Sequence, residues 1–195
     1  QRLVRFPALR KPRLDRVLRG NEDDLASVGL VSEHPLLRPA RDEDSAGVIT
    51  LIAAAFAEYP GNVLDVEVEE RGLLAPASSF EAFWVIDSGG QIAGCIAAAT
   101  RAPGVRAELK KCYVAKELRG KGWGRRLVAQ MEAWTLANGM QEVELWSDSR
   151  FLEGHQAYLG LGYHQTGALR ELHDLSHSTE WHFLKRLLPL PVPGA

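Results

Sequence analysis

The chain has 195 residues, of which 46% are hydrophobic and 25% are charged, and these values are typical of one globular domain. Its formal net charge of −2 excludes a general electrostatic attraction to nucleic acid or to anionic membranes. The longest apolar run, residues 48–57, is too short to cross a bilayer, so we expect no membrane span. The two cysteines, Cys95 and Cys112, fall within expected strands and are interpreted as reduced core thiols, which favours a cytoplasmic protein.

The two ends of the chain differ in composition from its middle, so we expect three parts. Residues 1–35 form a basic N-terminal extension, because the first twenty residues carry seven basic side chains and one acidic side chain. We interpret this extension as a solvated tail. The alternatives are an arm that packs on a second subunit of a homodimer, or one that touches nucleic acid, and the lack of aromatic residues beyond Phe6 counts against base stacking. Residues 36–188 form the domain, and residues 189–195 form a proline-rich tail.

Hydrophobic periodicity predicts alternating strands and helices in the middle part. The expected elements, in chain order, are a strand at 36–39, a helix from Asp42 or Asp44 to about Tyr59, a short helix within 65–71, strands at 83–86, 91–99 and 108–114, a helix from the end of a glycine-rich loop to Asn138, a strand at 142–146, a helix at 150–161, and strands at 163–166 and 180–184. This order predicts an α/β domain with a mixed sheet.

The glycine-rich loop, Arg119-Gly-Lys-Gly-Trp-Gly124, lies between the strand that ends at Val114 and the following helix. Glycines at the start of a helix expose backbone N–H groups and the positive end of the helix dipole, so the loop predicts a phosphate or pyrophosphate site. A dinucleotide-binding G-x-G-x-x-G is excluded because Arg125 occupies the position of its third glycine. No nucleoside-triphosphate motif, G-x-x-x-x-G-K-[ST], occurs in the chain.

The pattern that fits is Arg-x-x-Gly-x-Gly, formed by Arg119, Gly122 and Gly124. It resembles the loop on which the GNAT superfamily of acyl-CoA-dependent N-acyltransferases binds the coenzyme A pyrophosphate, and the order of elements from 36 to 188 is also that of the GNAT fold. The resemblance implies a mixed, mostly antiparallel central β-sheet flanked by helices, and acetyl-CoA as cosubstrate. The residues that it assigns to cofactor binding are Cys112, Tyr113, Val114, Arg119, Gly120, Lys121, Gly122, Trp123, Gly124 and Arg125.

Acetyl transfer to an amine needs a base for the ammonium proton, a donor to the developing oxyanion and an acid for the departing thiolate. Tyr158 matches the family's tyrosine, three residues, glycine, aromatic pattern, which implies that its hydroxyl is the general acid. Glu108 begins the strand before the glycine loop, where several similar proteins have a catalytic glutamate. The alternative is that Glu108 forms an ion pair with Lys110 or Arg106. A chain of waters would then act as the base.

Two further positions qualify the resemblance. The side chain of Cys112 is interpreted as part of the core, because no nearby His/Asp pair in the sequence would activate a thiolate. Family members often have an asparagine seven residues before the tyrosine, and this chain has Phe151 there. Ser149 or Arg150 is the expected substitute for its contact with pantetheine.

The acceptor is less determined by the sequence. Acidic residues after the first expected helix suit a cationic amine, and Arg170 suits a carboxylate. His173, Asp174 and His177 lack a fourth ligand, so we expect no metal. The predicted function is transfer of an acetyl group to a primary amine of a small molecule, an amino acid or an amino metabolite. The alternatives are a protein or peptide N-acetyltransferase and a non-catalytic acyl-CoA-binding regulatory domain.

Overall fold

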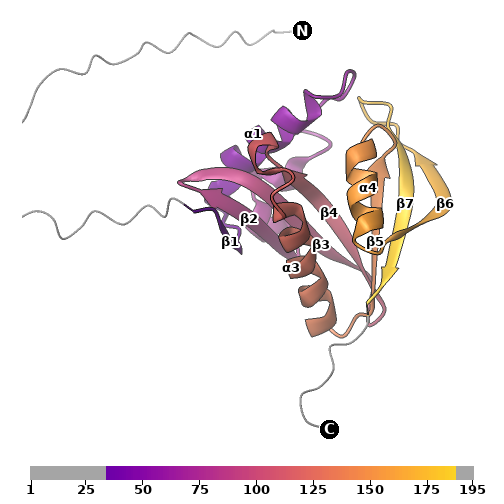
Figure 1. Ribbon diagram of the computed structural model, residues 1–195. Coiled ribbons are helices and arrows are strands. Elements are labelled where there is room, and N and C mark those ends of the chain that lie inside the picture. The colour runs from indigo at the N-terminus through magenta and orange to yellow at the C-terminus, as the bar shows by residue number, and fades with distance from the viewer. Residues whose placement is uncertain (1–33, 188–195) are drawn as a thin grey trace, which may run out of the picture. The chain divides into compact units, whose positions relative to one another are not determined.

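The computed structural model describes residues 34–187 (Figure 1), so the expectations for most of the extension 1–35 and for the tail 189–195 lie outside the described residues. The strands are β1 (Leu36–Pro39), β2 (Ala82–Ser88), β3 (Gln91–Ala102), β4 (Arg106–Val114), β5 (Glu142–Asp148), β6 (His164–Glu171) and β7 (Thr179–Arg186). The α-helices are α1 (Ser45–Phe56), α2 (Pro76–Ser79), α3 (Trp123–Ala137) and α4 (Leu152–Gly160). None of the helices in this part of the chain is long and apolar enough to cross a membrane.

A single sheet joins the strands in the order β1-β2-β3-β4-β5-β7-β6. Strands β4 and β5 are parallel, and the other neighbours are antiparallel. The parallel pair extends from Arg106 opposite Glu142 to Glu108 opposite Glu144, although both strands continue beyond these residues. The strands therefore diverge, as the upper part of Figure 1 shows, and the centre of the sheet opens. The expected mixed, mostly antiparallel sheet flanked by helices is confirmed.

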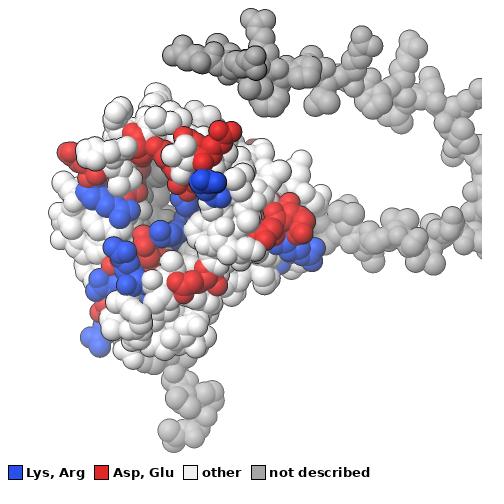
Figure 2. Space-filling view, turned by 180° about the vertical axis from the view of Figure 1, so that it is seen from behind, with Lys and Arg blue, Asp and Glu red and all other residues white. Residues whose placement is uncertain are grey.

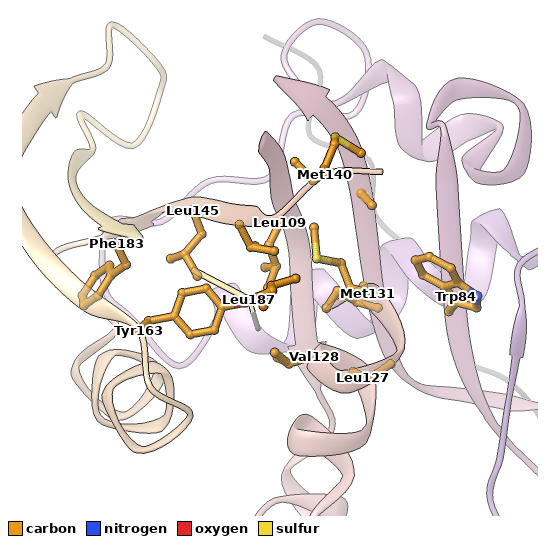
Figure 3. Close-up of a cluster of buried hydrophobic side chains, with 14 of the residues drawn as sticks. Trp84, Leu109, Leu127, Val128, Met131, Met140, Leu145, Tyr163, Phe183 and Leu187 are labelled. Atoms are coloured by element: carbon orange, nitrogen blue, oxygen red, sulfur yellow. The ribbon is translucent and has the colours of Figure 1, made fainter. Parts of the chain in front are cut away.

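The two faces of the sheet bury separate hydrophobic clusters, because successive strand side chains point to opposite faces. Phe83 and Val85 of β2 belong to the cluster that also contains buried side chains of α1. Trp84 and Ile86 belong to the cluster that contains buried side chains of α3. Figure 3 shows this second cluster continuing from Trp84 on β2 to Phe183 on β7. Helices α1 and α3 thus pack on opposite faces of the sheet.

The short helix expected within residues 65–71 is a wrong prediction. The Asp65 carboxylate accepts hydrogen bonds from the N–H groups of Glu67 and Val68, at 2.9 and 3.0 Å, and this local turn competes with a helix. A 3₁₀ helix at Arg71–Leu74 follows, and α2 begins at Pro76, whose fixed φ suits a first helical position.

Smaller differences concern the ends of other elements. Strand β4 begins at Arg106 instead of Glu108, because the preceding turn is tight, with φ of 71° at Gly104. Helix α1 ends at Phe56, three residues before the expected Tyr59, and α4 begins at Leu152, two residues after the expected start.

Candidate functional site

Two adjoining cavities lie where β4 and β5 diverge. The first, here called the loop cleft, has a volume of about 520 Å³ and is bordered by the end of β4, the glycine-rich loop and α4. The second, here called the charged cavity, has a volume of about 190 Å³ and is bordered by residues 62–70, β4, β5 and the β6–β7 hairpin. Five residues line both cavities, namely Cys112, Tyr113, Ser147, Phe151 and Tyr158. A molecule in one cavity can therefore touch a molecule in the other at these five residues.

The glycine-rich loop presents unpaired backbone donors at the start of α3. Gly120 and Gly122 have φ of 71° and 83°, a conformation that side chains with a Cβ atom disfavour. No side chain caps α3, and the first N–H group to bond along the helix is that of Arg126, which donates to the Gly122 carbonyl at 3.1 Å. Among the described residues, the N–H groups at positions 123–125 therefore have no acceptor. This arrangement favours an anion.

The Arg119 side chain is already engaged by the protein. Its Nε donates to the Val114 carbonyl at 2.9 Å, and its two terminal nitrogens donate to the Glu58 carboxylate at 2.6 and 2.8 Å. These hydrogen bonds lower the pKa of Glu58, so the pair is ionised at neutral pH. Arg119 thus ties the end of β4 to the segment after α1, and the backbone donors of the loop are better placed for a phosphate than its guanidinium.

The end of β4 has an open edge on the side of β5. Its pairing with β5 stops at Glu108, while its other edge pairs with β3, with Tyr113 opposite Cys95 and Val114 opposite Gly94. Lys111, with φ of 52°, marks an irregularity in the β3–β4 register. An open strand edge offers main-chain donors and acceptors to an extended ligand.

Tyr158, on α4, lies where the two cavities meet. Its ring is 5.8 Å from that of Tyr163, and its hydroxyl contacts the Cys112 thiol. Burial, with the neighbouring Cys112, raises the pKa of Tyr158 well above 10, so its hydroxyl keeps its proton at neutral pH. Burial likewise raises the pKa of Cys112 to about 11, so Cys112 is a neutral thiol, as expected for a core cysteine. Tyr158 is suited to donate a proton, and Cys112 is not suited to act as a nucleophile.

Ser147 and His155 form a polar pair beside Tyr158 that the sequence analysis missed. His155 Nε2 is 3.2 Å from Ser147 Oγ, and its ring stacks on Trp181 with centroids 4.9 Å apart. Burial lowers the pKa of His155, which favours a neutral ring at neutral pH, and its Nδ1 has no hydrogen-bond partner among the described residues. Only the packing of α4 on β5 and β7 brings these residues together, so no local motif signals the pair.

The charged cavity has a mixed lining, with six acidic and three basic side chains: Glu69, Glu70, Glu108, Asp148, Asp174, Glu180, Lys110, Lys111 and Arg170. The face opposite to that of Figure 1 is hollowed, and acidic and basic side chains alternate around the hollow (Figure 2). Glu108 is 9% exposed, and the nearest cation to its carboxylate is Lys110, at 3.7 Å. Arg106 instead pairs with Glu142 and Glu144 on β5.

Two loops that border the charged cavity are joined by hydrogen bonds. The Ser176 hydroxyl accepts the Val63 N–H at 2.8 Å and donates to the Val63 carbonyl at 3.3 Å. The Glu69 carboxylate accepts the Leu175 N–H at 2.9 Å. The loop after α1 is thereby fastened to the β6–β7 loop beside the cavity.

The structure brings most of the predicted site residues together. The predicted residues Cys112, Tyr113, Val114, Arg119, Gly120, Gly124, Arg125 and Tyr158 line the loop cleft. Glu108 lines the charged cavity, and Lys121, Gly122 and Trp123 lie in the loop without lining the cleft.

The substitutes expected for the missing asparagine lie differently. Ser149 lines neither cavity, because β5 ends at Asp148 and the Ser149 N–H donates to the Thr179 carbonyl at 2.8 Å. Arg150 is held by Asp148 at 2.5 Å. Phe151 packs against Tyr59, with ring centroids 4.7 Å apart. No group of three or more His, Cys, Asp or Glu side chains within residues 34–187 is arranged to hold a metal ion.

Comparison with solved structures identifies the same fold in bacterial acetyltransferases. An acetyltransferase of the GNAT family from Staphylococcus aureus Mu50 superposes with a TM-score of 0.68, at 15% identity, over 80% of this chain and 100% of that chain. The yncA protein of Salmonella typhimurium, a putative acetyltransferase solved with its cofactor acetyl-CoA, superposes with a TM-score of 0.63, at 18% identity, over 83% of this chain and 99% of that chain. At these identities the likeness concerns the fold.

The sequence itself matches a curated protein and a family model. An 85-residue segment is 29% identical to N-acetylaspartate synthetase of Danio rerio, covering 44% of this chain and 30% of that protein's length. The model of the acetyltransferase (GNAT) family matches residues 49–163, which include β4, the glycine-rich loop and Tyr158. The chain therefore belongs to the GNAT family of acetyl-CoA-dependent acetyltransferases.

Proposed function

We propose that this protein transfers the acetyl group of acetyl-CoA to a primary amine of a small molecule, by direct attack in a ternary complex. The observation that carries the proposal is the small charged cavity, which meets the loop cleft at Cys112, Tyr113, Ser147, Phe151 and Tyr158. A peptide acceptor needs a long groove, whereas this cavity has a volume of about 190 Å³ and is bordered by two loops that the contacts of Val63 with Ser176 and of Glu69 with Leu175 join.

The residues of the loop cleft fit acetyl-CoA. The unpaired N–H groups at the start of α3 suit its pyrophosphate, with Arg125 adding positive charge. The open edge of β4 at Cys112–Val114 suits the amides of the pantetheine arm, and a backbone N–H there can also polarise the thioester carbonyl. The Ser147 hydroxyl, held by His155, is a polar group near the position where Phe151 replaces the family's asparagine.

Acetyl-CoA supplies a thioester whose acetyl group passes to the amine nitrogen as the carbon–sulfur bond breaks. Glu108 accepts the proton that the amine loses, directly or through a water, because a charged ammonium is not a nucleophile. Tyr158 donates its hydroxyl proton to the departing sulfur, and its raised pKa keeps that proton available. The acetylated amine and coenzyme A thiol are the products.

The curated relative supports a small acceptor. The protein from Danio rerio is named for the synthesis of N-acetylaspartate, which is an acetylated amino acid. The match covers 30% of that protein's length, so an amino acid acceptor for this chain is part of the proposal.

A screen of amines with acetyl-CoA, read as release of free coenzyme A thiol, tests the proposed function. We expect amino acids or other small primary amines to support turnover, and peptides with free N-termini or lysines to support little. The control reactions lack either the acceptor or the protein. Turnover with peptides alone would favour a protein N-acetyltransferase. Binding of acetyl-CoA without turnover on any amine would favour the non-catalytic regulatory domain.

A further inference from the structure

Most acidic side chains of the charged cavity are already bound by protein donors. Five of them accept hydrogen bonds from the backbone or from basic side chains: Glu69, Glu70, Asp148, Asp174 and Glu180. Glu108 differs, because Lys110 at 3.7 Å is beyond hydrogen-bond distance of its carboxylate. Glu108 is therefore the acidic group most available to a positively charged amine.

Among the cations of the same cavity, Arg170 is the one that offers a planar pair of available donors, because Lys110 is a single ammonium 3.7 Å from the Glu108 carboxylate. Lys111 is bound to Glu70. The Arg170 Nε donates to the Glu180 carboxylate at 2.5 Å, while its two terminal nitrogens have no hydrogen-bond acceptor in the described part of the chain. These nitrogens belong to a side chain that lines the cavity on the β6–β7 side.

Two contacts fix the orientation of this guanidinium. Glu180, opposite Arg170 in the β6–β7 register, holds one edge through Nε. The Trp146 ring lies against its face, with 4.4 Å between the guanidinium carbon and the ring centroid. A planar guanidinium held at one edge and one face presents its two terminal nitrogens as a fixed fork, and this geometry matches the two oxygens of a carboxylate.

We propose that the acceptor carries a carboxylate as well as the amine, and that Arg170 binds this carboxylate and thereby selects amino acids over simple amines. The inference rests on the proposed function, since it names the class of acceptor for the same site. The amine lies toward Glu108 and the five shared residues, and the carboxylate lies toward Arg170 and Trp146. The cavity then places the Glu108 carboxylate near the positive amine of a zwitterion and the Arg170 guanidinium near its negative carboxylate.

The test compares each amino acid with its carboxamide, which keeps the amine and nearly the same shape but lacks the negative charge. The panel contains glycine, aspartate, β-alanine and γ-aminobutyrate, each with its amide, and taurine as a sulfonate. For the preferred acceptor we expect the wild-type kcat/KM to exceed that of the amide by roughly 10- to 100-fold, the range of a charged hydrogen-bonded pair. The separation of amine and carboxylate in the preferred acceptor then measures the distance between the two subsites.

Variants connect this selectivity to Arg170. Arg170→Ala should raise KM for the amino acid by a similar factor, leave its amide almost unaffected and leave KM for acetyl-CoA unchanged. Arg170→Lys, which keeps the charge and loses the fork, should be intermediate. Arg101→Ala is the matched control, because Arg101 is 62% exposed and does not line the cavity, and it should keep the wild-type ratio. Arg170→Gln replaces Arg170→Ala if the latter does not fold, as judged by thermal melting.

Three results would overturn the inference while leaving the proposed function intact. In the first, the wild-type enzyme acetylates the carboxamides as well as the amino acids. In the second, Arg170→Ala impairs turnover of the amino acid and of its carboxamide equally. In the third, Lys110→Ala abolishes the selectivity for the amino acid while Arg170→Ala does not. A preference for taurine over every amino acid of the panel would also overturn the inference, because the group that Arg170 binds would then be a sulfonate. Failure of every amine to support thiol release would instead contradict the proposed function itself.

Discussion

The loop cleft and the charged cavity are built in different ways. The loop cleft has backbone donors along the end of β4 and at the start of α3, all within residues 112–125. The charged cavity has charged side chains from four separate parts of the chain. The divergence of β4 and β5 and the hydrogen bond between the loop after α1 and the β6–β7 loop bring them together. Backbone recognition tolerates changes of side chain, whereas side-chain recognition changes with each substitution. This difference agrees with the proposal that the cleft binds a donor common to the family and the cavity binds an acceptor particular to this chain.

The largest effect is expected at Tyr158, where the two regions meet. Tyr158→Phe should lower kcat by roughly 100-fold or more, because it removes the proposed proton donor, with little change in acetyl-CoA binding. Since the pKa of Tyr158 lies well above 10, ionisation of this group should not lower the wild-type rate as pH rises through neutrality. Steady-state kinetics and a binding titration with acetyl-CoA measure the two effects.

Tyr163→Phe is the matched control for this change. Tyr163 is 2% exposed, donates its hydroxyl to Glu132 at 3.0 Å and lines neither cavity. It should lower thermal stability and keep the rate. A wild-type rate for Tyr158→Phe would remove Tyr158 as the acid.

The next largest effect is expected on binding in the loop cleft, with little change in the charged cavity. Arg119→Ala combined with Gly122→Ala should weaken coenzyme A binding by roughly 10- to 100-fold, because it unfastens β4 and places a Cβ atom at a φ of 83°. Isothermal titration with coenzyme A measures the change, and KM for the acceptor should vary little. Lys116→Ala, a basic residue outside the cleft lining, should bind as the wild type does. Unchanged affinity of the double variant would contradict the assignment of the loop.

A smaller effect tests Glu108 on the side of the cavity. Glu108→Gln should lower kcat/KM about tenfold and change the shape of the pH–rate profile, because it removes the proposed base. The pH–rate profile is the measurement, since a substitution that only disturbed packing would lower the rate at every pH. Glu67→Gln, which makes the same change of charge on an exposed side chain outside the cavity, should keep the profile. An unaltered profile for Glu108→Gln would favour the water chain as base.

The smallest effect compares two serines at the end of β5. Ser147→Ala should raise KM for acetyl-CoA by roughly 2- to 10-fold, the range of one neutral hydrogen bond, because its hydroxyl lines both cavities. Ser149→Ala should have no effect, because Ser149 lines neither cavity. The opposite result would support Ser149 as the substitute for the family's asparagine.

The sequence predicts the loop cleft better than the charged cavity, and the reason is the distance along the chain between contacting residues. Gly122, Gly124 and Tyr158 carry their signals in short patterns, and the order of strands and helices follows from local periodicity. The contact between Ser147 and His155 requires α4 to pack on the sheet. The fork of Arg170 needs Glu180 from one strand and Trp146 from another. Such contacts depend on the register of β5, β7 and β6, which no short pattern specifies.

The divergence of β4 and β5 also has a consequence for stability. The two halves of the sheet are joined there by pairing at three positions, so the protein has an incomplete sheet at its centre. In the proposed complex, an extended pantetheine arm on the edge of β4 would supply hydrogen bonds that a neighbouring strand otherwise makes. Acetyl-CoA at 100 times its dissociation constant should therefore stabilise the folded state by about 2.7 kcal/mol, and slow amide exchange at Cys112–Val114 most of all. The donor substrate would then act as a temporary strand of the sheet that binds it.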